Sequence, residues 1–159
     1  MSVFTGLSPP FVFHVLGCEI EKVRGESGCV NSSLEYLLTQ HPEILVLRIK
    51  TSKCSDEGLL YILSLGKRLT HIQLSRSKIT GDHIRLTEIS SLTTTLENLE
   101  DLDISDCRNI SETGFISLLN IVGVRLRKLN MRRLRISLSE ISSLTTTLPN
   151  LEDLDISVL

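Results

Sequence analysis

Cysteine and histidine are the residue types of this chain most able to carry chemistry, because both bind metals and both serve as catalytic groups. The four cysteines contain no Cys-x-x-Cys pair, and the four histidines form neither a His-x-His nor a His-Glu-x-x-His motif. Their positions are Cys18, Cys29, Cys54, Cys107, His14, His41, His71 and His83. The sequence therefore predicts no metal site.

The motifs of nucleophilic and nucleotide-dependent catalysis are missing as well. The sequence has no Gly-x-Ser-x-Gly elbow, no Gly-x-Gly-x-x-Gly turn and no Gly-x-x-x-x-Gly-Lys phosphate loop. No spacing places a general base beside a nucleophile. We therefore expect a protein that is not an enzyme and that needs no cofactor.

The length of the chain indicates its domain count, and its charge limits the classes of partner that it can bind. The chain has 159 residues, the size of one domain. Lysine and arginine number 17 against 19 acidic residues, so no polybasic surface for nucleic acid or an anionic membrane is indicated. No stretch approaches the about 18 apolar residues of a membrane helix. The scattered cysteines and the absence of basic residues before Glu19 favour a reducing compartment, the cytoplasm or the nucleus.

The elements that must position any functional side chain follow from an internal repeat. A Leu-x-x-Leu-x-Leu spacing of leucine and isoleucine occurs five times, with starts 25, 30, 27 and 25 residues apart. Each occurrence predicts a short strand, and the segments between them predict helices near residues 56–65, 82–96, 112–122 and 139–147. The five registers are Ile44-Leu47-Ile49, Leu69-Ile72-Leu74, Leu99-Leu102-Ile104, Leu126-Leu129-Met131 and Leu151-Leu154-Ile156.

This pattern resembles the leucine-rich repeat, in particular the cysteine-containing subtype with LxxLxLxxC followed by ITDxGL. The third register is the most similar, with Cys107 at the ninth position and Gly114-Phe115 at the Gly-Leu position. The resemblance implies an α/β solenoid whose curved parallel sheet lies on the concave side and whose helices lie on the convex side. It also makes Cys54 and Cys107 packing residues. Residues 1–43 then form a degenerate N-terminal cap, and residues 44–159 form five repeats, the last one incomplete.

A duplicated block supports a repeat architecture. Residues 88–105 recur at 140–157 with a single difference, Glu97 against Pro149. The offset of 52 residues equals two repeats. A solenoid tolerates such a duplication because each unit contacts only its neighbours.

The side chains between the repeat leucines are the candidate partner-binding residues. In the implied geometry they point out of the concave face, in stripes of alternating charge. They are Arg48, Lys50, His71, Gln73, Arg76, Asp101, Asp103, Asp106, Lys128, Asn130, Arg132, Arg133, Asp153 and Asp155.

Two interpretations of these stripes stay open at this level. Neighbouring strands lie about 4.8 Å apart, so Lys128 and the arginines of adjacent strands can neutralise Asp101 and Asp103. In that case the charges only solvate the sheet, since exposed pairs contribute about 0–1 kcal/mol. Alternatively, the stripes recognise a protein partner by charge complementarity.

A second resemblance concerns function. The segments LEDLDIS, RLRKLNMRRL and LPNLEDLDIS are similar to the repeat region of the ZYG-11 and ZER-1 substrate receptors of cullin-2 ubiquitin ligases. The F-box leucine-rich-repeat receptors of cullin-1 ligases share the cysteine-containing repeat. Both resemblances imply a protein-interaction module that holds a client, with cullin-ligase subunits bound by another element. An extracellular or immune-type recognition domain, or a truncated fragment without independent function, are the alternatives.

Overall fold

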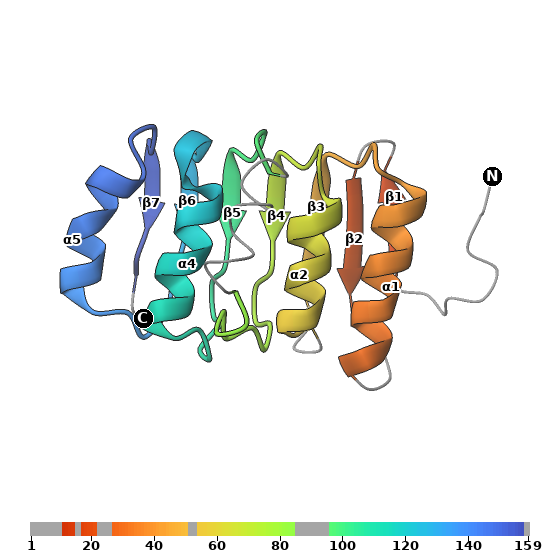
Figure 1. Cartoon of the computed structure of the whole chain (residues 1–159), viewed down its shortest axis with the longest axis horizontal. Helices are drawn as coiled ribbons and strands as arrows, with labels where there is room; N and C mark the ends of the chain where they lie inside the picture. The colour runs from red at the N-terminus through yellow and green to blue at the C-terminus, as the bar shows by residue number, and fades with distance from the viewer. Residues whose placement is uncertain (1–10, 15–16, 22–26, 51–53, 85–95, 158–159) are drawn as a thin grey trace.

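The computed structural model describes residues 11–14, 17–21, 27–50, 54–84 and 96–157. The described strands form a single seven-stranded sheet in the order in which they occur along the chain (Figure 1). The strands are β1 (Phe11–His14), β2 (Gly17–Glu21), β3 (Val46–Lys50), β4 (His71–Gln73), β5 (Asp101–Asp103), β6 (Lys128–Asn130) and β7 (Asp153–Asp155). The helices are α1 (Ser27–Gln40), α2 (Asp56–Leu65), α4 (Glu112–Val122) and α5 (Leu138–Thr147), with a short 3-10 helix η1 (Gly123–Arg125).

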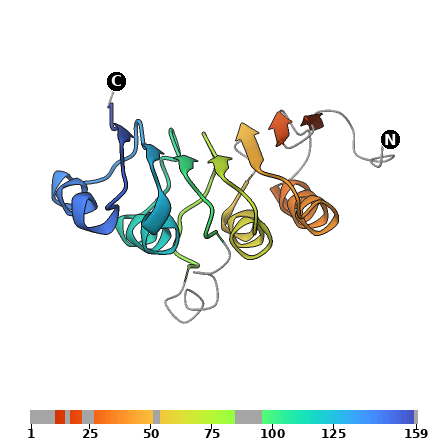
Figure 2. The same cartoon turned by 90° about the horizontal axis from the view of Figure 1, so that it is seen from above.

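Among the described strands, neighbours from β2 to β7 pair in parallel, whereas β1 and β2 pair antiparallel. Consecutive parallel strands need a crossover, and the four helices lie on one side of the sheet (Figure 2). The predicted α/β class with a parallel sheet is therefore confirmed. We call the opposite side of the sheet, which none of these helices covers, the open face.

The repeat leucines build the core between the sheet and the helices. In the first four registers every repeat position is buried, and none is more than 5 % exposed. In the fifth register Leu151 is half-buried, while Leu154 and Ile156 are 37 % and 39 % exposed. The difference follows from position, because β7 has a described neighbour on only one side.

The helix predictions for 56–65 and 112–122 are confirmed at both ends, and the helix expected at 139–147 begins one residue earlier. The start of the helix expected at 82–96 is wrong, since Asp82 and His83 form a turn. Gly81 has a φ of 77°, a left-handed conformation that interrupts a helix start. Leu96 also lies in a turn, and residues 85–95 lie outside the described residues.

The segment before the first repeat belongs to the same sheet. Strand β2 pairs in parallel with β3 over five residues, and α1 packs beside α2. The apolar face of α1 buries Leu34, Leu37 and Leu38 in the common core. This part of the chain therefore covers the β3 end of the repeats, and its predicted boundary at residue 43 stays a prediction.

Candidate functional site

The strand registers align the predicted binding residues in two rows across the open face. Side chains alternate between the two faces of a strand, so the residues on either side of each buried leucine share the open face. The first row is Arg48, Gln73, Asp103, Asn130 and Asp155, and the second is His71, Asp101, Lys128 and Asp153. Lys50 ends β3, and its side chain lies outside the described part of the structure.

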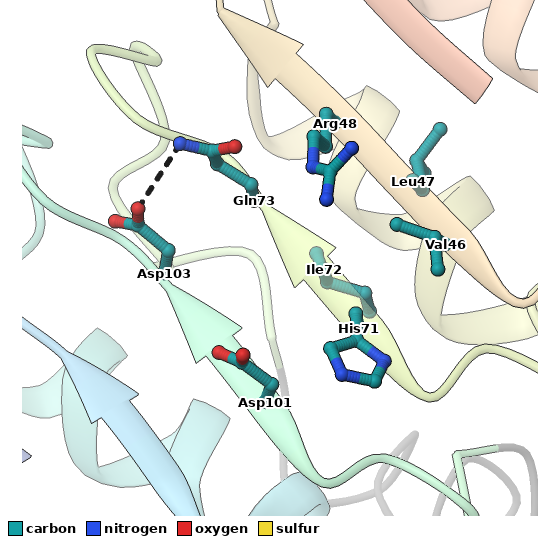
Figure 3. Close-up of a pocket in the computed structure, with 8 residues that line it drawn as sticks. All are labelled: Val46, Leu47, Arg48, His71, Ile72, Gln73, Asp101 and Asp103. Atoms are coloured by element: carbon teal, nitrogen blue, oxygen red, sulfur yellow. Dashed lines mark hydrogen bonds between the residues drawn. The ribbon is translucent and has the colours of Figure 1, made fainter. Parts of the chain in front are cut away.

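A shallow groove crosses this face between β3 and β5. It has an empty volume of about 460 Å³ that is open to solvent. Figure 3 shows the Arg48 guanidinium on one side and the carboxylates of Asp101 and Asp103 on the other, with His71 and Gln73 between them. Gln73 donates a hydrogen bond of 3.2 Å from Nε2 to Oδ2 of Asp103. The groove therefore offers one cationic wall and one anionic wall.

Three of the predicted binding residues hold the turns that follow their strands. Oδ1 of Asp103 accepts a bond from the Ser105 amide at 2.8 Å, and Oδ1 of Asp155 accepts one from Ser157 at 3.1 Å. Oδ1 of Asn130 likewise accepts a hydrogen bond of 3.1 Å from the amide of Arg132, two residues further along the chain. These are Asx turns, and the hydrogen bonds from Ser157 lower the pKa of Asp155. The sequence signal for this role was Asp or Asn at the last strand position.

The third residue after the end of β4, β5 and β6 also has a structural role. Arg76, Asp106 and Arg133 all adopt left-handed φ angles, of 63°, 57° and 57°. Each of their amides donates to a carbonyl in the following unit, at 2.9–3.0 Å. Such angles are uncommon for residues other than glycine, and this repeated hydrogen bond compensates for them. The sequence pattern did not predict this backbone role.

Neutralisation between strands occurs at the loops rather than at the strand centres. Asp106 pairs with Arg133 at 3.3 Å and Asp155 lies 4.0 Å from Arg132. Within the described residues no arginine neutralises Asp103, whose side-chain partners are the Ser105 amide and Gln73. Asp101 and Lys128 are direct cross-strand neighbours, yet no ion pair joins them in the described structure.

The charged side chains of the open face therefore fall into two groups, those that are paired within the structure and those that are available to a partner. Within the described residues, no hydrogen bond or ion pair occupies the side chains of Arg48, Arg76, Asp101, Lys128 and Asp153. Asp101 is partly buried at the edge of the groove, and Arg48 and Lys128 are exposed. Thr70 is hydrogen-bonded to Nδ1 of His71 at 2.8 Å. Arg48 and Arg76 place two positive charges on the β3 and β4 side, and Asp101, Lys128 and Asp153 then alternate in sign from β5 to β7.

The cysteine predictions can be tested for two of the four residues. Cys54 and Cys107 are free thiols and fully buried, which confirms that they are packing residues. Burial raises the pKa of each thiol to about 12, so neither is a thiolate at neutral pH. Sγ of Cys107 donates to the Leu74 carbonyl oxygen at 2.9 Å, which ties the loop to the preceding unit.

A second polar feature, on the helix side, was absent from the sequence analysis. Asp56 is only 7 % exposed and accepts bonds from the Thr80 amide at 2.6 Å and the Gly81 amide at 3.1 Å. Nδ1 of His83 lies 2.9 Å from its Oδ2. Burial acts to raise the pKa of Asp56, but hydrogen bonds from Thr80 and His83 outweigh it and leave that pKa lowered.

The same contact recurs one unit away on each side. Asn31 is 2 % exposed and bonds the Ser55 hydroxyl at 2.7 Å, and Ser111 bonds the carboxylate of Asp82. Asn31, Asp56 and Asp82 are spaced by 25 and 26 residues, the length of a repeat. This spacing was the sequence signal from which the recurring contact could have been predicted. The contacts satisfy polar groups at the start of neighbouring units, so we assign them to stability.

The described residues show neither a metal centre nor a membrane-spanning helix, and no protein family matches the chain. Among these residues, no group of three or more His, Cys, Asp or Glu could hold a metal ion. None of the described helices has the length and apolarity needed to span a bilayer. No protein-family model matches the chain, and no curated protein matches it.

Proposed function

We propose that the chain is a leucine-rich-repeat solenoid with its strands on the concave side, and that its open face binds a protein partner without catalysis. Three features recur from unit to unit and support the solenoid. They are the buried register of leucine and isoleucine, the left-handed loop residue and the backbone hydrogen bond from that residue to the next unit. Such a unit buries its apolar residues only by stacking on its neighbours.

The observation that carries the binding function is the set of available charges across the open face. Asp101, Lys128 and Asp153 alternate in sign from β5 to β7, with Arg48 and Arg76 as positive charges before them, and none of the five has a side-chain partner within the described residues. Charges that only solvated the sheet would gain by pairing with their neighbours, as Asp106 and Arg133 do. A partner with the complementary pattern would pair with these groups, and such patterns determine orientation and association rate.

The kind of partner follows from the resemblance to ubiquitin-ligase substrate receptors. We propose that the open face holds a client protein in the cytoplasm or nucleus, and that cullin-ligase subunits are bound by another element. Cys54 and Cys107 are buried free thiols, which agrees with a structural role for both residues.

A charge-swap variant tests the binding role without changing net charge. Asp101→Lys combined with Lys128→Asp inverts two adjacent positions of the open face. The matched control is Arg127→Glu with Glu152→Arg, which inverts an exposed ion pair of 2.7 Å outside the two rows. Each tagged chain is used for capture from cell lysate with quantitative mass spectrometry, after circular dichroism shows equal folding.

Binding through the open face predicts that specific partners are retained by the control and lost from the open-face swap. Their recovery should also fall as salt is raised. Equal recovery by both variants contradicts the open-face role. If partners depend on the open face but no cullin subunits accompany them, the ligase assignment is wrong while the binding role stands.

A further inference from the structure

The groove between β3 and β5 holds opposite charges that its own strands keep apart. Arg48 lies on β3 and Asp101 lies on β5, with β4 between them (Figure 3). Asp101 is two positions away from Asp103, the β5 residue in register with Arg48. Since neighbouring strands lie about 4.8 Å apart, the backbones of Arg48 and Asp101 are separated by about 12 Å. Within the described residues, neither side chain has a hydrogen-bond or ion-pair partner.

Strand β4 does not bridge these two charges. Its residues on the open face are His71 and Gln73. The ring of His71 is hydrogen-bonded through Nδ1 to the Thr70 hydroxyl at 2.8 Å, and Nε2 of Gln73 donates to Asp103 at 3.2 Å. A ligand that neutralises both sides of the groove must therefore supply one anionic group and one cationic group.

The position of the groove within the sheet favours a helix as that ligand. Strands β3, β4 and β5 are each paired on both sides, so an extended segment that crosses them finds no free strand edge. A helix needs no such edge, because its backbone hydrogen bonds are internal.

The separation of the charges also agrees with a helix. Residues seven positions apart lie on the same face of a helix, about 10.5 Å from each other along its axis. In an extended segment, residues on one face recur at about 6.7 Å and about 13.4 Å. Figure 3 shows that the guanidinium of Arg48 extends from β3 toward β4, so the charged groups lie closer together than their backbones do. The helical spacing therefore fits the groove better.

We propose that the groove binds a helix of the client protein that carries an acidic and a basic residue seven positions apart. The acidic residue pairs with Arg48 and the basic residue pairs with Asp101, while the side chains between them contact His71 and Gln73. The empty volume of about 460 Å³ receives these side chains. This inference rests on the proposed function of the open face and names the kind of segment that one part of that face receives.

A second copy of this chain is not a suitable source of the helix. The four described α-helices contain no lysine or arginine, so none of them offers the basic half of the pair. A different protein with complementary charges would gain the orientation and association rate that such patterns determine. The occupant is therefore a partner protein.

Titration of the full chain with helical peptides tests the proposal. The probe has about 20 residues of alanine and glutamine, with one glutamate and one lysine seven positions apart, and circular dichroism checks that it is helical. Amide NMR spectra of the isotope-labelled chain are recorded with up to millimolar peptide at low salt, where exposed charge pairs are strongest. We expect saturable shifts of the amides in β3, β4 and β5. A peptide of the same composition with the two charges four positions apart should bind about two- to five-fold more weakly, the loss of one exposed charge pair.

A matched pair of variants locates the binding. Residues 99–105 and 151–157 both read LEDLDIS, so Asp153 corresponds to Asp101 but does not line the groove. Asp101→Lys should weaken binding of the probe about three- to ten-fold, because repulsion replaces attraction, and Asp153→Lys should leave the affinity unchanged. A peptide with glutamate at both positions should bind the Asp101→Lys chain more tightly than the probe does, since its second glutamate then faces the introduced positive charge.

Two results overturn the proposal directly, namely absence of shifts in β3 to β5 and equal weakening by the two variants. Equal or tighter binding of a peptide in which proline residues prevent the helix also overturns it and identifies an extended segment as the occupant. Failure of the proposed function is distinguishable, because capture from lysate then shows no loss of partners from the open-face swap. Loss of partners from that swap without binding of the probe would leave the open-face role standing and reject the helix.

Discussion

The two copies of LEDLDIS allow a stability measurement in which sequence is constant and only the surroundings differ. Leu102 and Leu154 occupy the same position of these segments. Leu102 lies between Ile72 and Leu129 in the register and is 2 % exposed, whereas Leu154 has Leu129 on one side only and is 37 % exposed. We predict that Leu102→Ala destabilises the chain far more than Leu154→Ala.

The magnitudes follow from burial. Leucine to alanine in a packed core costs about 2–5 kcal/mol, of which part is transfer and part is the cavity left behind. We therefore expect about 3 kcal/mol for Leu102→Ala. At Leu154 the cavity is open to solvent and less apolar surface is lost, so we expect about 1 kcal/mol.

Urea unfolding followed by circular dichroism measures the difference. With an m-value of about 2 kcal/mol per molar, the midpoint should fall by about 1.5 M for Leu102→Ala and about 0.5 M for Leu154→Ala. The m-values of the two variants should agree with that of the wild type, since the comparison requires the same unfolding transition. Equal midpoint shifts, or a larger shift for Leu154→Ala, would refute the burial argument and the stacking order of β5, β6 and β7.

Three further predictions concern single positions. Gly114→Ala should destabilise by about 2–3 kcal/mol, because the added Cβ would overlap the Thr80 carbonyl oxygen, and an unchanged Tm in thermal unfolding would contradict this. Asp56→Asn should cost about 1–3 kcal/mol at neutral pH. The pKa of Asp56 is lowered in the folded state, so its ionised form stabilises the wild type fully above the ordinary Asp pKa of about 3.9. This stability is lost as the pH falls below that value toward the folded-state pKa, so the free energy of unfolding from urea titrations should depend less on acid pH in the variant. Iodoacetamide at neutral pH should leave Cys54 and Cys107 unmodified in the folded chain and modify both in urea, and mass spectrometry that finds either one alkylated without denaturant would contradict their burial.

The repeat spacing predicted the parallel strands and the ends of two helices, because burial at fixed intervals leaves few ways to arrange the chain. Helix α4 begins where Ser111 accepts a bond from the Gly114 amide, a cap that can be recognised from sequence. The turn at Asp82 could not be predicted in the same way, since the left-handed angle of Gly81 accompanies its close approach to Gly114 in the next unit. Contacts between units decide such positions.

The candidate site shows the same limit more clearly. The pattern identified which residues share the open face, because the alternation of side chains along a strand is a local property. It did not distinguish Asp101 from Asp103, two aspartates of one strand. Asp103 bonds the Ser105 amide and Gln73, whereas Asp101 has no side-chain partner within the described residues. That difference depends on the loop after the strand and on the residue that β4 supplies.

The duplicated segment separates what a sequence encodes from what its neighbours determine. Asp103 and Asp155 form the same turn in both copies, since the bond to the residue two positions ahead is local. Leu102 and Leu154 differ in exposure because burial needs a strand on each side. Hydrogen bonds within one turn are thus the same in both copies of the segment, whereas the burial of its side chains depends on the neighbouring units. A variant that changes only local chemistry should therefore act equally in both copies, and one that changes packing should not.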